Sequence, residues 1–398
     1  MEGYRHKRII YRQTLTISMR IFVISRGCPT PSDPTWGCFE LDQAQALSQL
    51  GHEVVMLSVD TRTRLKWRKI GISEYTYGHV HAMDMFLLPY SYRIIGWQLR
   101  QKITAKLLLR LYDYACRKFG KPDILYSHYL FNTQLAVSIK QKYHVPLVGI
   151  EHWSALNIRP VPQWVRTMVN ATYPHTDKVI AVSESLKQSI NECHKIPDIS
   201  VVHNMVGKEF TYTPAAPHPF TFVATGRLVY GKGFDLLPVA FSKIKDSLPD
   251  DWQMLIIGGG KERTNLQQQI NGSGLQDHIR LLGQKTKAEI IPLLQNSDVF
   301  ILPSRGENFS VAVLEALACG LPVISSVTGG IRECINAHNG LLFPVNDVDA
   351  LANALKTIYI NRTAYDRPAI AADCQARFSP QVIACQLTDI FQQVIAKQ

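Results

Sequence analysis

VFILPSRGENFSVAVLEALACGLPVISSV, at residues 299–327, carries the clearest fold signal in the chain. It begins with an apolar strand, passes through a short polar loop into a helix that starts near Ser310, and ends in a second apolar strand. Strands that are apolar on both faces and joined by helices are typical of a parallel sheet covered by helices. The stretch therefore predicts an α/β domain whose loops gather at one edge of the sheet.

The same alternation of apolar strands and helices recurs in both halves of the chain. It stops at TYTPAAPHPF, residues 211–220, because proline and small residues continue neither a strand nor a helix. We expect two doubly wound, Rossmann-like α/β lobes in tandem, facing a central cleft. The strand segments are MRIFVISRG, HEVVMLSVD, DILYSHY, PLVGIEH, DKVIAVS and ISVVHN, followed by FTFVATG, WQMLIIGGG, HIRLLGQ, DVFILPS, PVISSV, IRECI and GLLFP.

These patterns divide the chain into five segments. A basic tail precedes Met19, and either Met1 or Met19 is the start of the protein. Closing helices are expected at residues 349–362 and 380–397, and one arrangement packs the last helix back on the first lobe. The predicted segments are the tail 1–18, the first lobe 19–205, the linker 206–219, the second lobe 220–375 and the closing helix 376–398.

Composition excludes several classes of protein. Of the 398 residues, 46% are hydrophobic and 19% charged, as in a soluble globular protein large enough for two domains. No apolar run reaches the roughly 18 residues of a membrane span, and the basic tail lacks the apolar segment of a secretory signal. Eight cysteines without a CxxC pair and thirteen histidines without a HxxxH spacing predict reduced cysteines, no metal centre and a cytoplasmic location.

A candidate ligand site lies in the loop and helix of the opening stretch. Ligands of open parallel sheets bind beyond the carboxyl ends of the strands, where this loop must lie. The helix would offer the amides of Phe309, Ser310 and Val311 to an anion. Glu307 and Glu315 would repel a bare phosphate, so they indicate sugar hydroxyls beside it. Two ordinary surface glutamates are the alternative.

Several motifs in the second half resemble those of the family 4 type retaining glycosyltransferases, which have the GT-B fold. Glu307 and Glu315 match the E-x7-E motif of that family. The accompanying pieces occur in the family's order: GRLVYGKGFD, IIGGGKE, HIRLLGQ, the motif itself and VTGGIRECI. They span about residues 220–344, and the first half fits more loosely.

The resemblance implies a site for a nucleotide-diphosphate sugar of UDP or GDP type, used as co-substrate without a metal. Arg227 and Lys232 would hold the diphosphate through charge-assisted hydrogen bonds. A solvated surface pair is the alternative. Glu315 would bind the ribose and Glu307 a hydroxyl of the transferred sugar. The remaining implied donor contacts are Gly226, Gly231, Gly233, Gly258, Asn308, Phe309, Ser310, Gly329, Gly330 and Gly37.

The first lobe contains weaker matches. His152 ends a predicted strand and resembles a histidine of the family, where it could relay a proton. A core histidine is the alternative for His152, and for His128 it is favoured. Trp36 beside Gly37 departs from the family's usual glycine pair, and HNMVGKEF, residues 203–210, departs from its N-G-V-D hinge.

Asp347 and Asp349 have the spacing of a metal-binding DxD motif. They directly precede the apolar helix ALANALKTI, and aspartate is a preferred residue at a helix N-terminus. We therefore expect helix capping there, with Arg227 and Lys232 doing the work of a metal ion.

A net charge of +11 favours an anionic partner: a nucleotide, nucleic acid or anionic lipid headgroups. Basic residues concentrate at 62–69, beside Trp67, and at 91–121. In the second stretch a cationic side, Lys102, Lys106 and Arg110, lies beside an apolar stripe, Leu99, Ile103, Leu107 and Leu111. The stripe either faces the lobe's own core or belongs to a membrane-surface helix.

The prediction is thus a hexosyltransferase-type enzyme that moves a sugar, with retention, to a saccharide or lipid-linked saccharide. A role in cell-surface polysaccharide synthesis, peripheral to the inner face of a membrane, fits the basic first lobe. A nucleotide-sugar epimerase or glycosyl phosphorylase of the same fold is the alternative. A nucleic-acid-binding protein is more remote, because aromatic residues do not interleave with the basic runs.

Overall fold

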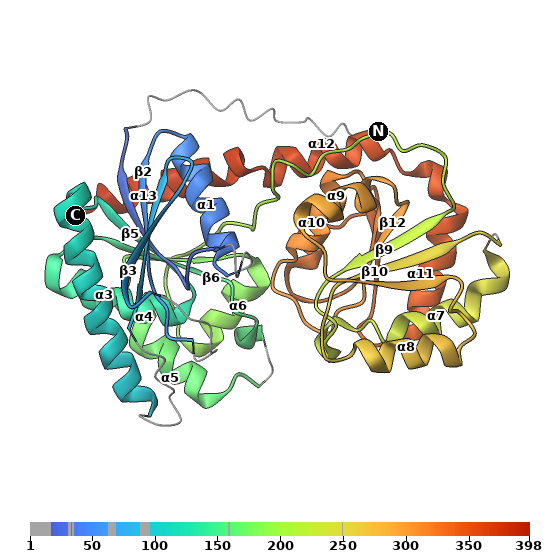
Figure 1. Cartoon of the computed structure of the whole chain (residues 1–398), viewed down its shortest axis with the longest axis horizontal. Coiled ribbons are helices and arrows are strands. Elements are labelled where there is room, and N and C mark those ends of the chain that lie inside the picture. Colours follow the sequence, from blue (N-terminus) through green and yellow to red (C-terminus); the bar gives the residue numbers. More distant parts are fainter. Residues whose placement is uncertain are drawn as a thin grey trace.

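The computed structural model describes residues 17–30, 33, 36–62, 69–87, 96–157, 160–248 and 250–398. Two lobes, each with a central sheet flanked by helices, lie side by side along the long axis of the molecule (Figure 1). The two α/β lobes predicted from the sequence are confirmed. The basic tail up to residue 16, residues 63–68 of the first basic run and residues 91–95 of the second lie outside the described residues.

The first lobe has an eight-stranded sheet in the order β3-β4-β2-β1-β5-β6-β7-β8. All neighbours are parallel except β3, which pairs antiparallel with β4. The β3–β4 hairpin is absent from the prediction, because polar residues interrupt both of its strands. The strands are β1 (Arg20–Ile24), β2 (Glu53–Val59), β3 (Gly71–Tyr77), β4 (Val80–Phe86), β5 (Ile124–His128), β6 (Leu147–Glu151), β7 (Lys178–Ala181) and β8 (Ile199–Val201).

The second lobe has a six-stranded parallel sheet in the order β11-β10-β9-β12-β13-β14. The expected segment IRECI is not a strand: it lies in a 3₁₀ turn, Gly329–Glu333, and the residues after it. Its backbone bonds are local, with the Ile331 amide donating to Thr328 O. The strands are β9 (Thr221–Thr225), β10 (Gln253–Ile257), β11 (Ile279–Gly283), β12 (Val299–Leu302), β13 (Val323–Ser326) and β14 (Gly340–Phe343).

Helices cover both faces of each sheet (Figure 1). Their starts follow local chemistry: Thr286 and Glu289 form a capping box at α9, and the side chain of Asp347 accepts the Ala350 amide at α11. The helices are α1 (Cys38–Gln49), α3 (Trp97–Phe119), α4 (Leu130–Tyr143), α5 (Gln163–Thr172), α6 (Glu184–Cys193), α7 (Leu236–Ile244), α8 (Arg263–Gly272), α9 (Lys287–Gln295), α10 (Val311–Ala318), α11 (Val348–Ile360), α12 (Arg367–Phe378) and α13 (Pro380–Ile395).

The chain crosses between the lobes twice. From β8 to β9 it passes through residues 202–220 without a helix or strand. It then returns through α12, which packs on α10, and α13, which packs on α1 (Figure 1). A buried hydrogen bond of 2.9 Å joins His52 to Thr388 on α13, and the ring of Phe391 packs on Tyr126. The returning helix is therefore part of the first lobe's core.

Candidate active site

Lys232 and Glu307 meet at the carboxyl edge of the second sheet. Lys232 Nζ donates to Glu307 Oε1 at 2.5 Å, and Ser304 Oγ donates to the same oxygen at 2.7 Å. The lysine and glutamate side chains are 23% and 12% exposed, so water screens their attraction only partly. Together the two donors hold the carboxylate in one orientation. Ser304 was not predicted as a site residue, although it lies two residues after the end of β12.

Glycine permits the loops around this pair to touch through their backbones. Gly233 has φ +67°, and a Cβ there would lie 2.0 Å from Pro303 O. Gly329 has φ +50°, and a Cβ there would lie 2.0 Å from Glu307 O. An alanine at either position would be strained and would clash. The two glycines therefore fix the loop of Lys232 and the diglycine loop against the E-x7-E loop.

The other predicted glycines of the second lobe differ in their surroundings. A Cβ on Gly258 would lie 1.8 Å from Gly226 O, so these two loops are also in direct contact. The Gly330 amide donates to Asn308 O at 2.7 Å. Gly231 has open space where a Cβ would point. Three of these four glycines thus lie in tightly packed loops, whereas no neighbouring atom explains a glycine at position 231.

Two further predicted features lie at the same edge. Arg227 directly follows Gly226, and within the described part of the chain no hydrogen bond or ion pair engages its exposed side chain. Ser310 is the N-cap residue of α10, but its hydroxyl makes no capping bond. The first amides of a helix have no acceptor within the helix, so those of α10 are available to an anion.

Glu315, on α10, lies beside a narrow cavity between the lobes that His152 and Lys287 also line. Burial raises the pKa of Glu315 to about 7, although Lys287 opposes the shift. Lys287 Nζ is engaged with Asp42 Oδ2 at 3.1 Å and Glu209 Oε1 at 3.3 Å. These two carboxylates also raise the pKa of Glu315, so its negative charge is only partly compensated.

His152 follows β6 and faces the second lobe. Its Nδ1 lies 3.1 Å from Asn204 Oδ1, and its Nε2 lies 3.3 Å from His128 Nδ1. The two imidazole rings are parallel within 3°. Burial lowers the pKa of His152 to about 4. Both nitrogens of this neutral ring are engaged, and the proton relay of His152 stays a prediction; His128 is a buried core residue.

Gly37 and Trp36 lie at the start of α1. Gly37 adopts φ +79°, and Trp36 Nε1 donates to Arg26 O at 3.0 Å. The guanidinium of Arg26 binds Glu40 at 2.7 Å and lies 4.1 Å from the ring centre of Tyr129. Trp36 therefore supports a cation that the sequence did not single out. Arg26 lies two residues after the end of β1, and predicted site residues of the second lobe likewise follow its strands.

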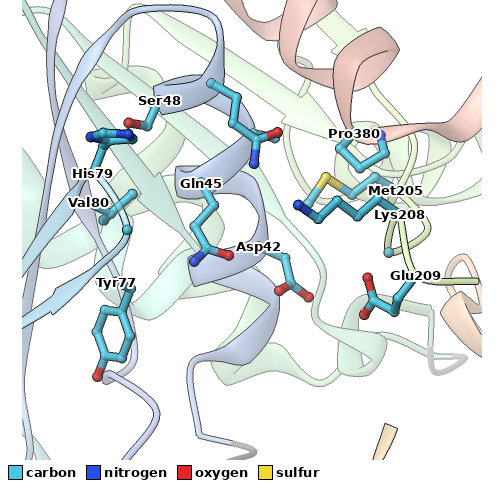
Figure 2. A pocket seen from close by; sticks show the side chains of 14 residues that line it. Asp42, Gln45, Ser48, Tyr77, His79, Val80, Met205, Lys208, Glu209 and Pro380 are labelled. Carbon is cyan, nitrogen blue, oxygen red and sulfur yellow. The ribbon is translucent and has the colours of Figure 1, made fainter. Parts of the chain in front are cut away.

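A cavity of about 380 Å³ lies on the other side of Asp42 from the predicted site. It contains none of the predicted site residues. Figure 2 shows α1 between the β3–β4 hairpin and the segment that joins the lobes, with side chains from all three reaching the hollow. Its labelled lining is Asp42, Gln45, Ser48, Tyr77, His79, Val80, Met205, Lys208, Glu209 and Pro380.

Two remaining expectations concern metals and membranes. Asp347 caps α11, as predicted, and no group of three or more potential metal ligands gathers in the part of the chain that the structure describes. No described helix combines the length and apolarity needed to cross a bilayer. In α3, Leu107 and Leu111 are buried in the core while Lys102 is exposed, so the apolar stripe mainly serves the lobe itself.

Comparison with known families identifies the class of protein. The model described as "Glycosyltransferase Family 4" matches residues 41–210, and "Glycosyl transferases group 1" matches residues 208–373. The two matches adjoin where the chain passes between the lobes, and together they cover both. The chain belongs to the family 4 type glycosyltransferases with the GT-B fold, and it is a glycosyltransferase.

Individual glycosyltransferases are similar to this chain over different shares of its length. A protein of Mycobacterium tuberculosis named glycogen synthase is 25% identical over 372 residues, which cover 89% of each chain. A phosphatidyl-myo-inositol mannosyltransferase of Mycobacterium leprae is 32% identical over 190 residues, covering 45% of this chain and 50% of that one. The crystal structure of Anabaena HepE with UDP has a TM-score of 0.72 at 19% identity, covering 94% of this chain and all of that one.

Proposed function

We propose that the protein transfers a sugar, with retention, from a nucleotide-diphosphate sugar to a hydroxyl of a saccharide or lipid-linked saccharide. The observation that carries this proposal is the pairing of Lys232 with Glu307 at the sheet edge where the exposed cation Arg227 follows β9. Cations suit a diphosphate, and a carboxylate held by two donors can still accept from a sugar hydroxyl. Glu315, in the cavity between the lobes, is the ribose contact.

A UDP-type donor is the first choice among nucleotides. HepE, which shares the fold, was crystallised with UDP and, separately, with UDP and glucose. The positive charge at Arg227 and the amides at the start of α10 supply what a diphosphate needs without a metal ion. A GDP-type donor would use the same groups, because they contact the diphosphate and not the base.

The chemistry proposed for this site is a front-face displacement. The bond between the anomeric carbon and the phosphate oxygen breaks while the acceptor oxygen bonds to the same face of that carbon. The proton of the acceptor hydroxyl passes to the departing phosphate oxygen. Arg227 and Lys232 stabilise the charge that develops on the diphosphate, which is where preorganised cations contribute most.

The acceptor would be a saccharide, free or lipid-linked. Among the relatives, one is named for glycogen synthesis and another for mannosyl transfer to phosphatidyl-myo-inositol, so both acceptor types occur. The exposed cations Lys102, Lys106 and Arg110 on α3 favour an anionic membrane surface and a role in cell-surface polysaccharide synthesis.

Thermal unfolding with UDP, GDP, UDP-glucose and GDP-mannose tests the donor. A ligand at 100 times its dissociation constant stabilises the folded state by about 2.7 kcal/mol, which is readily measured. Donor turnover is then followed with candidate saccharides. Release of nucleoside diphosphate only when an acceptor is present supports transfer, whereas conversion of the donor without release would identify an epimerase. Lack of stabilisation by every nucleotide would contradict the proposal.

A further inference from the structure

Asn204, in the segment after β8, bonds to both lobes with its single side-chain amide. Its Nδ2 donates to Phe309 O at 2.8 Å, directly before α10 in the second lobe. Its Oδ1 lies 3.1 Å from Nδ1 of His152 in the first lobe. A side chain with one donor end and one acceptor end thus connects an imidazole to the backbone of the E-x7-E loop.

This arrangement fixes the proton on the imidazole. A carbonyl oxygen only accepts, so the NH₂ end of Asn204 must face Phe309 O and its oxygen must face His152. Nδ1 of His152 therefore carries the hydrogen, and Nε2 is the acceptor. Nε2 accepts in turn from Nδ1 of His128 at 3.3 Å. The buried Nε2 of His128 then bears a lone pair, and it has no partner among the described residues.

A second connection between the lobes reaches the same histidine through its backbone. Asn308 Nδ2 donates to His152 O at 2.7 Å. Asn157 Nδ2 donates to Asn308 Oδ1 and approaches Glu307 O at 3.4 Å, while Ser189 Oγ donates to Asn157 Oδ1 at 2.6 Å. His152 is therefore held at its ring and at its carbonyl by residues that also hold the loop of Glu307.

We propose that Asn204 is a positioning residue that sets the tautomer and orientation of His152 only when the E-x7-E loop has closed onto the first lobe. Closing brings Phe309 O to the amide, which turns the amide oxygen to the imidazole. An open cleft would leave the amide free to rotate and the imidazole free to change its proton. The proposal rests on the proposed function and deepens it, because the same contacts hold His152 and the loop of Glu307, which that function places at a sugar hydroxyl.

The charged groups around His152 determine how a substitution at Asn204 changes the pKa of the imidazole. Burial is the main cause of the low pKa of His152; Arg26 lowers it further, whereas Glu40 raises it. The charged or titratable groups around this position are Arg26, Glu40, His128, Glu151, Lys287 and Glu315. A carboxylate in place of the amide would add a negative charge directly at Nδ1, which favours the imidazolium.

The test uses Asn204→Asp, which keeps the shape of the side chain but cannot donate to Phe309 O. Nitrogen-15 spectra of histidine-labelled protein should place the hydrogen of wild-type His152 on Nδ1, and the ring should stay neutral at pH 7. Asn204→Asp should raise the titration midpoint of His152 by about 1–2 pH units. Asn170→Asp is a matched control, because Asn170 Oδ1 lies 3.1 Å from Nδ1 of His194 at the surface. It should leave His152 unchanged.

A hydrogen on Nε2 in the wild type, or an unchanged midpoint in Asn204→Asp, would overturn the proposal. Asn204→Leu removes both bonds, and small-angle scattering should then show a larger radius of gyration than for the wild type; an equal radius would also count against it. If that variant does not fold, the isosteric Asn204→Asp serves for the scattering as well. Neither measurement uses a nucleotide sugar, so a failed donor screen would refute the proposed function without deciding the role of Asn204.

Discussion

The two lobes share an architecture but build their facing edges differently. In the second lobe the loops meet backbone to backbone, as Gly233 against Pro303 and Gly329 against Glu307 show. In the first lobe Gly37 makes one such approach, to Gly27 O, but side-chain partners such as Arg26 with Glu40 also hold the edge. Close backbone contact requires glycine, which is visible in a sequence. Side-chain pairing leaves no such mark, so the two halves of one cleft differ in how far they can be predicted.

Loss of the Lys232 ammonium should have the largest effect on turnover. Lys232→Ala removes the ammonium proposed to stabilise the leaving diphosphate, so turnover should fall by about 10²- to 10³-fold. Affinity for the free nucleoside diphosphate should fall much less, because Arg227 and the amides of α10 remain. Steady-state turnover and calorimetric binding measure the two effects.

Lys243→Ala is the control for this change. Lys243 pairs with Asp349 at the surface, so its loss should leave turnover unaffected. Equal turnover of Lys232→Ala and the wild type would show that Lys232 does not stabilise the leaving diphosphate. Catalysis would then not explain the glycines on either side of it.

Backbone contact in the second lobe can be broken directly with Gly233→Ala. The positive φ and the approach to Pro303 O should together lower the free energy of unfolding by about 2–4 kcal/mol. Urea denaturation measures the loss. Gly231→Ala, two residues away in open space, should change stability by less than about 0.5 kcal/mol. Similar losses in both variants would show that the loop does not depend on this contact.

Titration of Glu315 should change donor affinity by a smaller factor. With a pKa of about 7, its carboxylate forms as the pH rises through neutrality, and the charged form accepts more strongly from ribose hydroxyls. UDP affinity should therefore increase between about pH 6 and pH 8.5. Glu315→Gln should weaken UDP binding about tenfold at the upper pH and very little at the lower one. Calorimetry at the two pH values measures this.

Protein stability should decrease as the pH rises, whereas UDP affinity should increase. Because the folded pKa of Glu315 lies above that of an unfolded glutamate, the folded state binds more protons between the two values. Stability contributed by this group is present at low pH and is lost as the pH rises towards about 7. Glu315→Gln should remove that part of the pH dependence. A pH dependence identical to that of the wild type would show that Glu315 does not titrate in this range.

Patterns of apolar residues and glycine explain most of what could be predicted. Every strand of the second sheet lies within an expected segment, because these strands are apolar runs. The strand predicted for IRECI is wrong, because a short apolar run between turns fits a strand and a 3₁₀ turn equally well. The hairpin β3–β4 was missed because its edge strand is half polar, as in GISEYTY.

The site residues also divide into those that a sequence motif marks and those that it does not. Glu307 and Lys232 were found because motif and glycine spacing marked them, and the structure brings them together. Asn157 and Arg26 carry no local signal, since a lone asparagine in a turn or a lone arginine after a strand occurs in any protein. Their partners lie far away in sequence, such as Asn308 for Asn157. Contacts of that kind depend on how the lobes meet, which one sequence does not reveal.

The smallest effect is expected at the exposed side of α3, where the first lobe would meet an anionic membrane. Exchange of Lys102, Lys106 and Arg110 for alanine should reduce binding to vesicles that contain anionic lipid, by about 1 kcal/mol for each cation near the surface. Stability should change little, because these side chains are exposed while Leu107 and Leu111 supply the packing. Flotation with and without anionic lipid measures the binding, and wild-type flotation that ignores lipid charge would leave α3 as a core-facing helix alone. A lipid-dependent result would show that the first lobe, too, has a functional surface, built from exposed charge where the second lobe uses packed glycine.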